Sequence, residues 1–276
     1  RIMGHETSLR AGVFSLTDRR SNYRIVRQLV EGTPVLHKIT IPEGLRIEQT
    51  AEIYQDKLNI DADVFLALCG DPKFIKSLNV EALSLEGFLF PNTYHFYKGV
   101  TPERIIQTMV AEYQKLLDGM LKSRLQIRGL TELEMVTLAS IIEGEAIYDS
   151  ERSLISSVYH NRLAIKMRLQ ADPTIQYIIE DGPRRLLKND LKIKSPYNTY
   201  LNYGLPPGPI NSPGRESLIS ALLPAHSDYL FFVANGEGYH TFSRTETEHN
   251  VAKKKFQRLR RQMRNKKSAK TENKLG

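Results

Sequence analysis

The residues with the clearest potential for chemistry lie in the stretch TLASIIEGEA, residues 137–146, where Glu143 stands inside an apolar run. Burying an ionised carboxylate without a partner is costly, so such a group is usually paired, protonated or functional. If this stretch is helical, the residues one turn away are mostly small: Ala139, Ser140, Ala146 and Ile147. The resulting hollow would desolvate the carboxyl group and raise its pKa. The pattern predicts a general acid suited to a glycosidic oxygen.

A second carboxylate is not fixed by local spacing. Glu145 is two residues further on, roughly 200° around a helix, so its side chain diverges from that of Glu143. Glycosidases normally flank the bond with two carboxylates, and folding could bring Glu86 or Asp172 near. The alternative is a structural Glu143, buried in an ion pair with an arginine such as Arg162.

Other catalytic chemistries lack their motifs. The sequence contains no HExxH, GxSxG, Walker or GxGxxG pattern. Its seven histidines show no metal-ligand spacing, and Cys69 is the only cysteine, so no cysteine zinc site can form. We therefore expect no cofactor and no metal ion.

The charge is concentrated at one end of the chain. Of the 39 Lys and Arg residues, eleven lie in residues 251–276 beside a single acid, although the whole chain carries a net charge of +8. A nearly neutral body with a basic C-terminal helix or tail argues against a nucleic-acid enzyme, which spreads cations over a binding face. No apolar run reaches the roughly 20 residues that cross a bilayer. The chain starts without Met, which leaves an upstream anchor open.

The elements before Glu143 predict a small module and a connecting helix. Residues 35–41 read as a strand, followed by a Pro-Glu-Gly turn and two short helices, which form a β-α-α unit. The segment EGFLFPNTYHFY, residues 86–97, is dense in aromatic rings. It either packs between two modules or places Glu86 at the edge of a cleft. Thr101 then begins an amphipathic helix over about residues 102–122.

The elements around Glu143 predict a central buried helix and a hairpin. Thr131 and Glu134 have capping-box spacing, and apolar residues follow on every side of the helix. A second helix begins at Asp149 or Ser150. The stretch YLFFVANGEGYHTFS, residues 229–243, reads as a β-hairpin around an Asn-Gly-Glu-Gly turn. The predicted fold class is α+β.

A proline-rich loop offers groups that suit a sugar. Residues 195–214, SPYNTYLNYGLPPGPINSPG, combine prolines with Tyr and Asn, which indicates a stiff, ordered loop. Aromatic faces stack on sugar rings, and amides bind hydroxyl and acetamido groups. The alternative is a packed loop whose polar groups satisfy its own turns. The same two interpretations apply to LQADPT, residues 169–174. The candidate substrate-binding residues are Gln170, Asp172, Tyr197, Asn198 and Tyr200.

Taken together, these segments resemble the MltG/YceG-like family of endolytic murein transglycosylases. The resemblance rests on TIPEG, EGFLFPNTYHF, LASIIEGEA, VYHNRL with MRLQADPT, SPYNTYLNYGLPPGPI and YLFFVANGEGYHTFS, in order over about residues 35–250. It implies a LysM-like module in residues 1–80, a catalytic domain in residues 81–250 and a basic tail in residues 251–276. It also implies that Glu143 is the catalytic glutamate. Family members often have Lys or another polar residue where this chain has Gly144.

The resemblance further implies a reaction that needs no second carboxylate. Glu143 would protonate the β-1,4 oxygen between N-acetylmuramic acid and N-acetylglucosamine. It would then take the proton of the muramoyl C6 hydroxyl, which closes a 1,6-anhydro ring. Asn161 and Glu86 are implied as further substrate contacts.

The implied setting is the bacterial cell envelope. The substrate would be peptidoglycan glycan strands, cleaved at the outer face of the cytoplasmic membrane by a protein held there by one N-terminal helix. The cell-wall elongation machinery is the implied partner. The competing class is a non-catalytic peptidoglycan-binding or scaffold protein.

Overall fold

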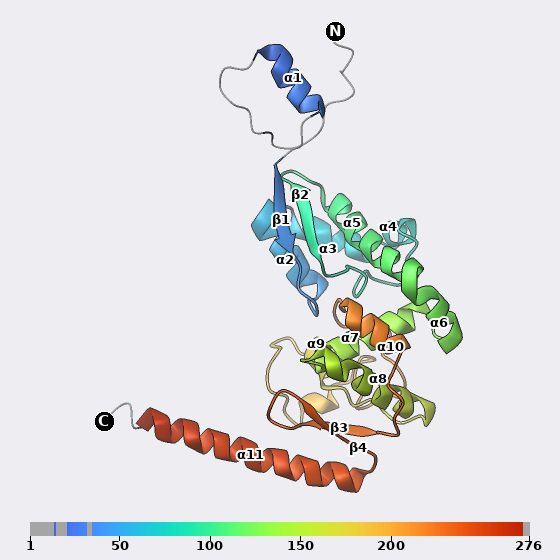
Figure 1. Cartoon of the computed structure of the whole chain (residues 1–276), viewed down its shortest axis with the longest axis vertical. Helices are drawn as coiled ribbons and strands as arrows, with labels where there is room; N and C mark the ends of the chain where they lie inside the picture. The colour runs from blue at the N-terminus through green and yellow to red at the C-terminus, as the bar shows by residue number, and fades with distance from the viewer. Residues whose placement is uncertain (1–13, 15–20, 32–34, 273–276) are drawn as a thin grey trace. The chain divides into compact units, whose positions relative to one another are not determined.

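The chain folds into two compact units, residues 1–117 and residues 118–276, in a computed structural model (Figure 1). The structure describes residue 14, residues 21–31 and residues 35–272. The architecture is mixed α+β, with mostly helical units and two small antiparallel sheets, so the predicted fold class is confirmed. In the part of the chain that the structure describes, no helix is both long and apolar enough to span a membrane.

The first unit is built around two antiparallel strands. Strands β1 (Leu36–Thr40) and β2 (Thr93–Tyr97) pair with Leu36 opposite Tyr97 and Thr40 opposite Thr93. Between them the chain forms helices α2 (Ile47–Leu58), α3 (Ala62–Gly70) and α4 (Pro72–Ser77). Helix α1 (Asn22–Glu31) precedes the sheet, and α5 (Pro102–Leu116) follows it. The order β-α-α-α-β therefore extends the predicted β-α-α unit by a helix and a returning strand.

Aromatic rings fill the core of this first unit. Tyr54 of α2 contacts Phe65 of α3 and Phe96 of β2, with ring centroids 6.0 and 5.9 Å apart. Phe88 meets Tyr113 of α5 edge to face at 5.4 Å. The aromatic segment 86–97 thus packs inside the first unit, because its strand completes the sheet. The observed division after residue 117 consequently falls later than the predicted boundary at residues 80/81.

The second unit surrounds one central helix, α7 (Glu132–Glu145). Thr131 and Glu134 form the predicted capping box at its start. Eight consecutive residues, Met135 to Ile142, are buried, as expected for a helix that is apolar on all sides. Its neighbours are α8 (Asp149–Ala164), α9 (Asp172–Ile178) and α10 (Arg215–Leu222). A short π-helix (Leu117–Leu121) and α6 (Lys122–Arg128) precede it.

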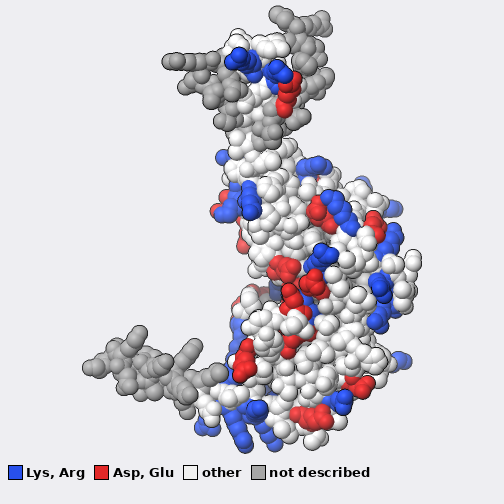
Figure 2. Space-filling view, viewed as in Figure 1, with Lys and Arg blue, Asp and Glu red and all other residues white. Residues whose placement is uncertain are grey.

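The predicted hairpin closes the second unit. Strands β3 (Phe231–Ala234) and β4 (His240–Ser243) pair antiparallel, with Phe231 opposite Ser243. Helix α11 (Glu246–Glu272) begins beside the hairpin and packs on both strands (Figure 1). Lys and Arg residues gather on the described surface of this helix at the bottom of Figure 2, where Lys253, Lys254, Lys255 and Arg258 are exposed.

Candidate active site

The last turn of α7 directs two carboxylates into different surroundings. Glu143 and Glu145 are separated by Gly144, and two residues turn the helix by about 200°. Ala146, in an extended conformation, then ends the helix. Because α7 is central to its unit, the side chains of Glu143 and Glu145 both point toward other elements and not simply into solvent.

Glu143 is held in a buried ion pair. Both nitrogens at the end of Arg152 reach it: Nη2 donates to Oε1 at 3.1 Å, and Nη1 lies 3.1 Å from Oε2. The Gly214 amide and the Ser217 hydroxyl also donate to Oε2, at 2.9 and 2.8 Å. The side chains of Glu143 and Arg152 are only 7% and 6% exposed. Four contacts from three residues therefore hold this carboxyl group in place.

Glu145 faces a cavity of about 510 Å³ in the second unit. The Tyr159 hydroxyl donates to Glu145 Oε1 at 3.0 Å. Burial, followed by the negative charge of Asp172, raises the pKa of Glu145 to about 7, although Tyr159 and Arg162 oppose the rise. A carboxyl group with this pKa is substantially protonated near neutral pH. Glu145 therefore combines a raised pKa with a position on the cavity wall.

Arg162 forms the cationic side of the cavity. Its Nε donates to the Leu230 carbonyl at 2.7 Å and its Nη1 to the Leu169 carbonyl at 2.5 Å. The guanidinium also lies 5.4 Å from the centre of the Phe231 ring. Burial lowers the pKa of Arg162, although arginine remains charged at any physiological pH. A fixed positive charge beside Glu145 favours the carboxylate that remains once the proton has been transferred.

Three of the predicted substrate-binding residues also line this cavity. Gln170, Asp172 and Tyr200 all line the cavity with Glu145. The Tyr200 hydroxyl donates to Asp172 Oδ1 at 2.5 Å. Burial, reinforced by this hydrogen bond, raises the pKa of Tyr200, so its hydroxyl stays protonated. The structure thus brings these three predicted residues together, around the second glutamate of IIEGEA.

Thr199 joins the two segments of this wall. Its carbonyl accepts from the Gln170 amide at 3.1 Å, and its hydroxyl accepts from the Ala171 amide at 2.9 Å. The same hydroxyl lies 2.9 Å from the Thr174 hydroxyl. These contacts are buried, so they fix the loop on either side of Tyr200 against the start of α9.

Gly144 allows α7 to approach α9 closely. A Cβ atom at this position would lie 2.6 Å from Pro173 Cβ and 2.8 Å from Pro173 Cγ, well inside van der Waals contact. Pro173 directly follows Asp172. The missing side chain therefore sets the separation between the helix that bears Glu145 and the segment that bears Asp172.

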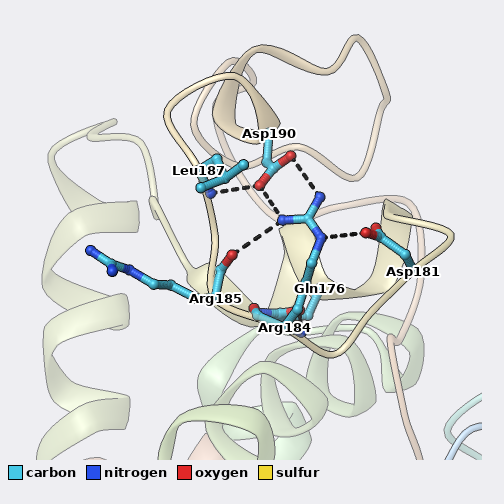
Figure 3. Close-up of polar contacts among 6 residues, drawn as sticks. All are labelled: Gln176, Asp181, Arg184, Arg185, Leu187 and Asp190. Atoms are coloured by element: carbon cyan, nitrogen blue, oxygen red, sulfur yellow. Dashed lines mark hydrogen bonds and ion pairs between the residues drawn. The ribbon is translucent and has the colours of Figure 1, made fainter. Parts of the chain in front are cut away.

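A polar cluster stabilises the loop that follows α9 (Figure 3). Arg184 binds both oxygens of Asp190, at 2.7 and 3.0 Å, and its Nε donates to Asp181 at 2.6 Å. Gln176 of α9 exchanges two hydrogen bonds with the backbone of Arg184. The guanidinium lowers the pKa of Asp190 to about 2. This cluster anchors the loop to α9, next to the segment that bears Tyr200.

The remaining predicted site residues lie outside this cavity lining. Asn198 is fully buried, and its amide donates to the carbonyls of Leu191 and Ile193 at 3.1 and 2.7 Å. Tyr197 contacts the Tyr177 ring at 4.9 Å. Asn161 donates to the carbonyls of Ser227 and Tyr229 at 2.8 and 2.9 Å. For Asn198 the contacts match the packed-loop alternative, in which polar groups satisfy turns of the loop, whereas Asn161 of α8 binds the segment before β3.

Glu86 belongs to the first unit. Its side chain is buried there, and Oε2 accepts from the Ile47 amide at 3.5 Å. Burial raises the pKa of Glu86 to about 8, with a further contribution from Glu48. Its described contacts are with its own unit, so nothing in them joins it to the cavity around Glu145.

Sequence reasoning missed two residues and misassigned a third. Glu145 was considered only as a partner for Glu143, although the helical angle already showed that the two face different ways. Arg152 had no local signal, because it lies on the next helix. Arg162 was one example of a partner in the alternative of a structural Glu143; Arg152 pairs with Glu143, and Arg162 lines the cavity.

A fold that encloses a protonatable glutamate, a fixed arginine and a polar wall in one cavity is typical of an enzyme. The chain belongs to the YceG-like family, whose model matches residues 1–255. The predicted family is thereby confirmed.

Named relatives make this membership more specific. An endolytic murein transglycosylase of Bacillus subtilis is 36% identical over 266 residues, which cover 91% of this chain and 74% of the relative. A protein of the same name from Streptococcus pneumoniae is 34% identical and matches 89% of this chain but 51% of its own length. A crystal structure of a putative YceG-like protein from Listeria monocytogenes is 36% identical, with a TM-score of 0.72 over 89% of this chain and 85% of that one.

Proposed function

We propose that this chain is a lyase, an endolytic murein transglycosylase that cleaves glycan strands of peptidoglycan. The names of its relatives support the substrate and the reaction class. The observation that carries the proposal is the position of Glu145: its carboxyl group lines a large cavity, and its pKa is raised to about 7.

In this proposal Glu145, not Glu143, acts first as acid and then as base. Glu145 donates its proton to the β-1,4 oxygen between N-acetylmuramic acid and N-acetylglucosamine, and positive charge develops at the muramoyl C1. The resulting carboxylate, beside Arg162 and Tyr159, accepts the proton of the C6 hydroxyl as that oxygen attacks C1. The products are a strand ending in 1,6-anhydro-N-acetylmuramic acid and a strand with a free 4-hydroxyl. Proton and bond changes balance without water.

Glu143 would then have a structural role. Its ion pair with Arg152 and its bonds to Gly214 and Ser217 join α7 to α8 and α10, which holds the end of α7 in place. Gln170, Asp172 and Tyr200 would contact the glycan from the lining of the same cavity. Asp172 is the available second carboxylate should water attack instead.

The decisive experiment compares Glu145→Gln with Glu143→Gln on purified peptidoglycan. The first variant should keep its fold and lose cleavage by at least about a hundredfold, as expected for loss of a general acid. Full activity in Glu145→Gln would reject the assignment. Mass spectrometry of the products should show muramoyl ends one water lighter than those of hydrolysis. Reducing muramic acid ends would instead identify a hydrolase that uses Asp172.

The proposed place of action is the cell envelope, at the outer face of the cytoplasmic membrane, with an N-terminal anchor in the full-length protein. The first unit would serve as a LysM-like module, in which three helices and a returning strand follow β1. The cell-wall elongation machinery is the proposed partner. Binding of both units to sacculi without release of soluble fragments would favour the non-catalytic scaffold instead.

A further inference from the structure

Two tyrosines outside the cavity lining form a stacked pair in the second unit. Tyr148, which precedes α8, and Tyr239, which precedes β4, have ring centroids 4.3 Å apart and planes inclined by 21°. Each remains 41% exposed after stacking. Gly238 lies directly against Tyr148, since a Cβ there would be 2.9 Å from the Tyr148 ring. The stacked rings thus link the loop after α7 to the turn of the hairpin.

The pair is connected to the cavity wall through nearby residues of the chain. Tyr148 is three residues beyond Glu145, and Tyr239 directly precedes His240, and both Glu145 and His240 line the cavity. A second contact fixes the same two segments: Glu151 accepts from the His240 amide at 2.8 Å and lies 2.9 Å from His240 Nδ1. These two side chains are 8% and 10% exposed, so the junction beneath the tyrosines is buried and already secured.

Because this buried contact holds the two segments together, the stacking of the exposed rings is not needed for that purpose. Glu151 and His240 already connect the loop to the hairpin through hydrogen bonds. Large aromatic side chains normally bury most of their area, so the exposure of these two rings is unusual. Ile147, adjacent to the pair, is 69% exposed and extends the apolar surface. Exposed aromatic faces next to a polar cavity suit a ligand with alternating apolar and hydroxylated surfaces.

We propose that Tyr148 and Tyr239 form a sugar-binding subsite that extends the cavity, where a pyranose ring of the glycan strand lies against the aromatic faces. The inference deepens the proposed function and rests on it. The subsite would hold a sugar one or more residues away from the bond at Glu145. It would therefore favour long strands over short ones, which is what cleavage within a strand requires. Its contribution would appear in binding and KM, since neither ring reaches the reacting atoms.

The test compares wild type with Tyr148→Ala and Tyr239→Ala on two substrates, long glycan strands and the shortest fragment that wild type cleaves. For long strands, KM and the dissociation constant should rise about three- to tenfold, as expected for loss of aromatic contacts, with kcat within twofold. For the short fragment, KM and the dissociation constant should stay unchanged. Tyr148→Phe and Tyr239→Phe, which keep the rings, should behave as wild type. Tyr203→Ala, which removes another exposed tyrosine of this unit, is the matched control.

The outcomes separate the two proposals. Alanine variants that bind and cleave long strands like wild type, or that lose activity equally on both substrates, would overturn the subsite. A folded wild type that cleaves neither substrate would instead reject the proposed function. If the alanine variants do not fold, Tyr148→Leu and Tyr239→Leu keep apolar bulk but remove the aromatic face. These leucine variants should then show the same rise in KM and dissociation constant on long strands alone.

Discussion

Glu143 and Glu145 lie two residues apart on α7, yet only one of them is paired with a cation. Glu143 accepts from Arg152, Gly214 and Ser217 in a buried cluster, whereas Glu145 accepts from Tyr159 at the wall of a cavity. One short helical segment therefore places one carboxyl group in a buried ion pair and the other on a cavity wall, which is the basis of the roles proposed for them. Several measurable consequences depend on this division.

Glu143→Gln should destabilise the second unit. Removing one partner of a buried ion pair leaves the other charge poorly compensated, which costs about 3 kcal/mol. Chemical denaturation would measure the loss. Asp118→Asn removes the partner of Lys122 in an exposed pair, whose side chains are 66% and 65% exposed, and should cost less than about 0.5 kcal/mol. A Glu143→Gln protein of wild-type stability without activity would return the acid role to Glu143.

The activity should fall as the pH rises through about 7. A general acid works only while protonated, and burial raises the pKa of Glu145 to about 7. A pH profile of kcat/KM should therefore show an alkaline limb near this value. Because the charge of Asp172 contributes to the raised pKa, Asp172→Asn should move that limb to lower pH. A limb that stays in place would show that another group controls it.

Glu86 should make the first unit less stable as the pH rises. Its folded pKa of about 8 lies above the ordinary glutamate value of 4.5, so the folded state holds the proton more tightly. The stabilisation is fully present below about pH 4.5 and is lost as the pH rises toward 8. Glu86→Gln should flatten this dependence, by an amount on the order of 5 kcal/mol. Urea unfolding at several pH values would measure it, with the exposed Glu52→Gln of α2 as a comparison.

Gly144→Ala should disturb the cavity, although Gly144 is not one of its lining residues. The new methyl group would overlap Pro173, so α9 must shift or the helix must strain, at a cost of about 1–3 kcal/mol. Because Asp172 precedes Pro173, activity should fall as well. Gly70→Ala, at the end of α3, meets nothing within 4 Å and should be neutral or slightly stabilising. A stable, fully active Gly144→Ala protein would show that this close approach is not needed.

Local sequence signals predicted the elements well. The capping box at Thr131, the apolar run of α7 and the Asn-Gly-Glu-Gly turn each act within a few residues, and all three appear in the structure. The same holds for the start of α8 at Asp149. Such features follow from neighbouring residues alone, so no knowledge of the tertiary fold is required.

The arrangement of the site depended on contacts between distant segments. The angle between Glu143 and Glu145 was predictable, but which direction opens on a cavity is decided by Arg152, Ser217 and the hairpin, which lie far along the chain. Likewise, Asn198 and Tyr200 looked equivalent as loop residues. Asn198 is buried because it binds the turn around Leu191 and Ile193, while Tyr200 contacts Asp172.

The order of the cavity's walls along the chain also bears on its biosynthesis. Glu145 is made early, whereas lining residues of the hairpin and α11 extend as far as Phe256. A polypeptide that leaves the ribosome, or crosses a membrane, with its N-terminus first would carry Glu145 without an enclosed pocket until the segment through Phe256 has emerged. Chains that stop before the hairpin would lack the complete cavity and, under the proposed function, should be inactive.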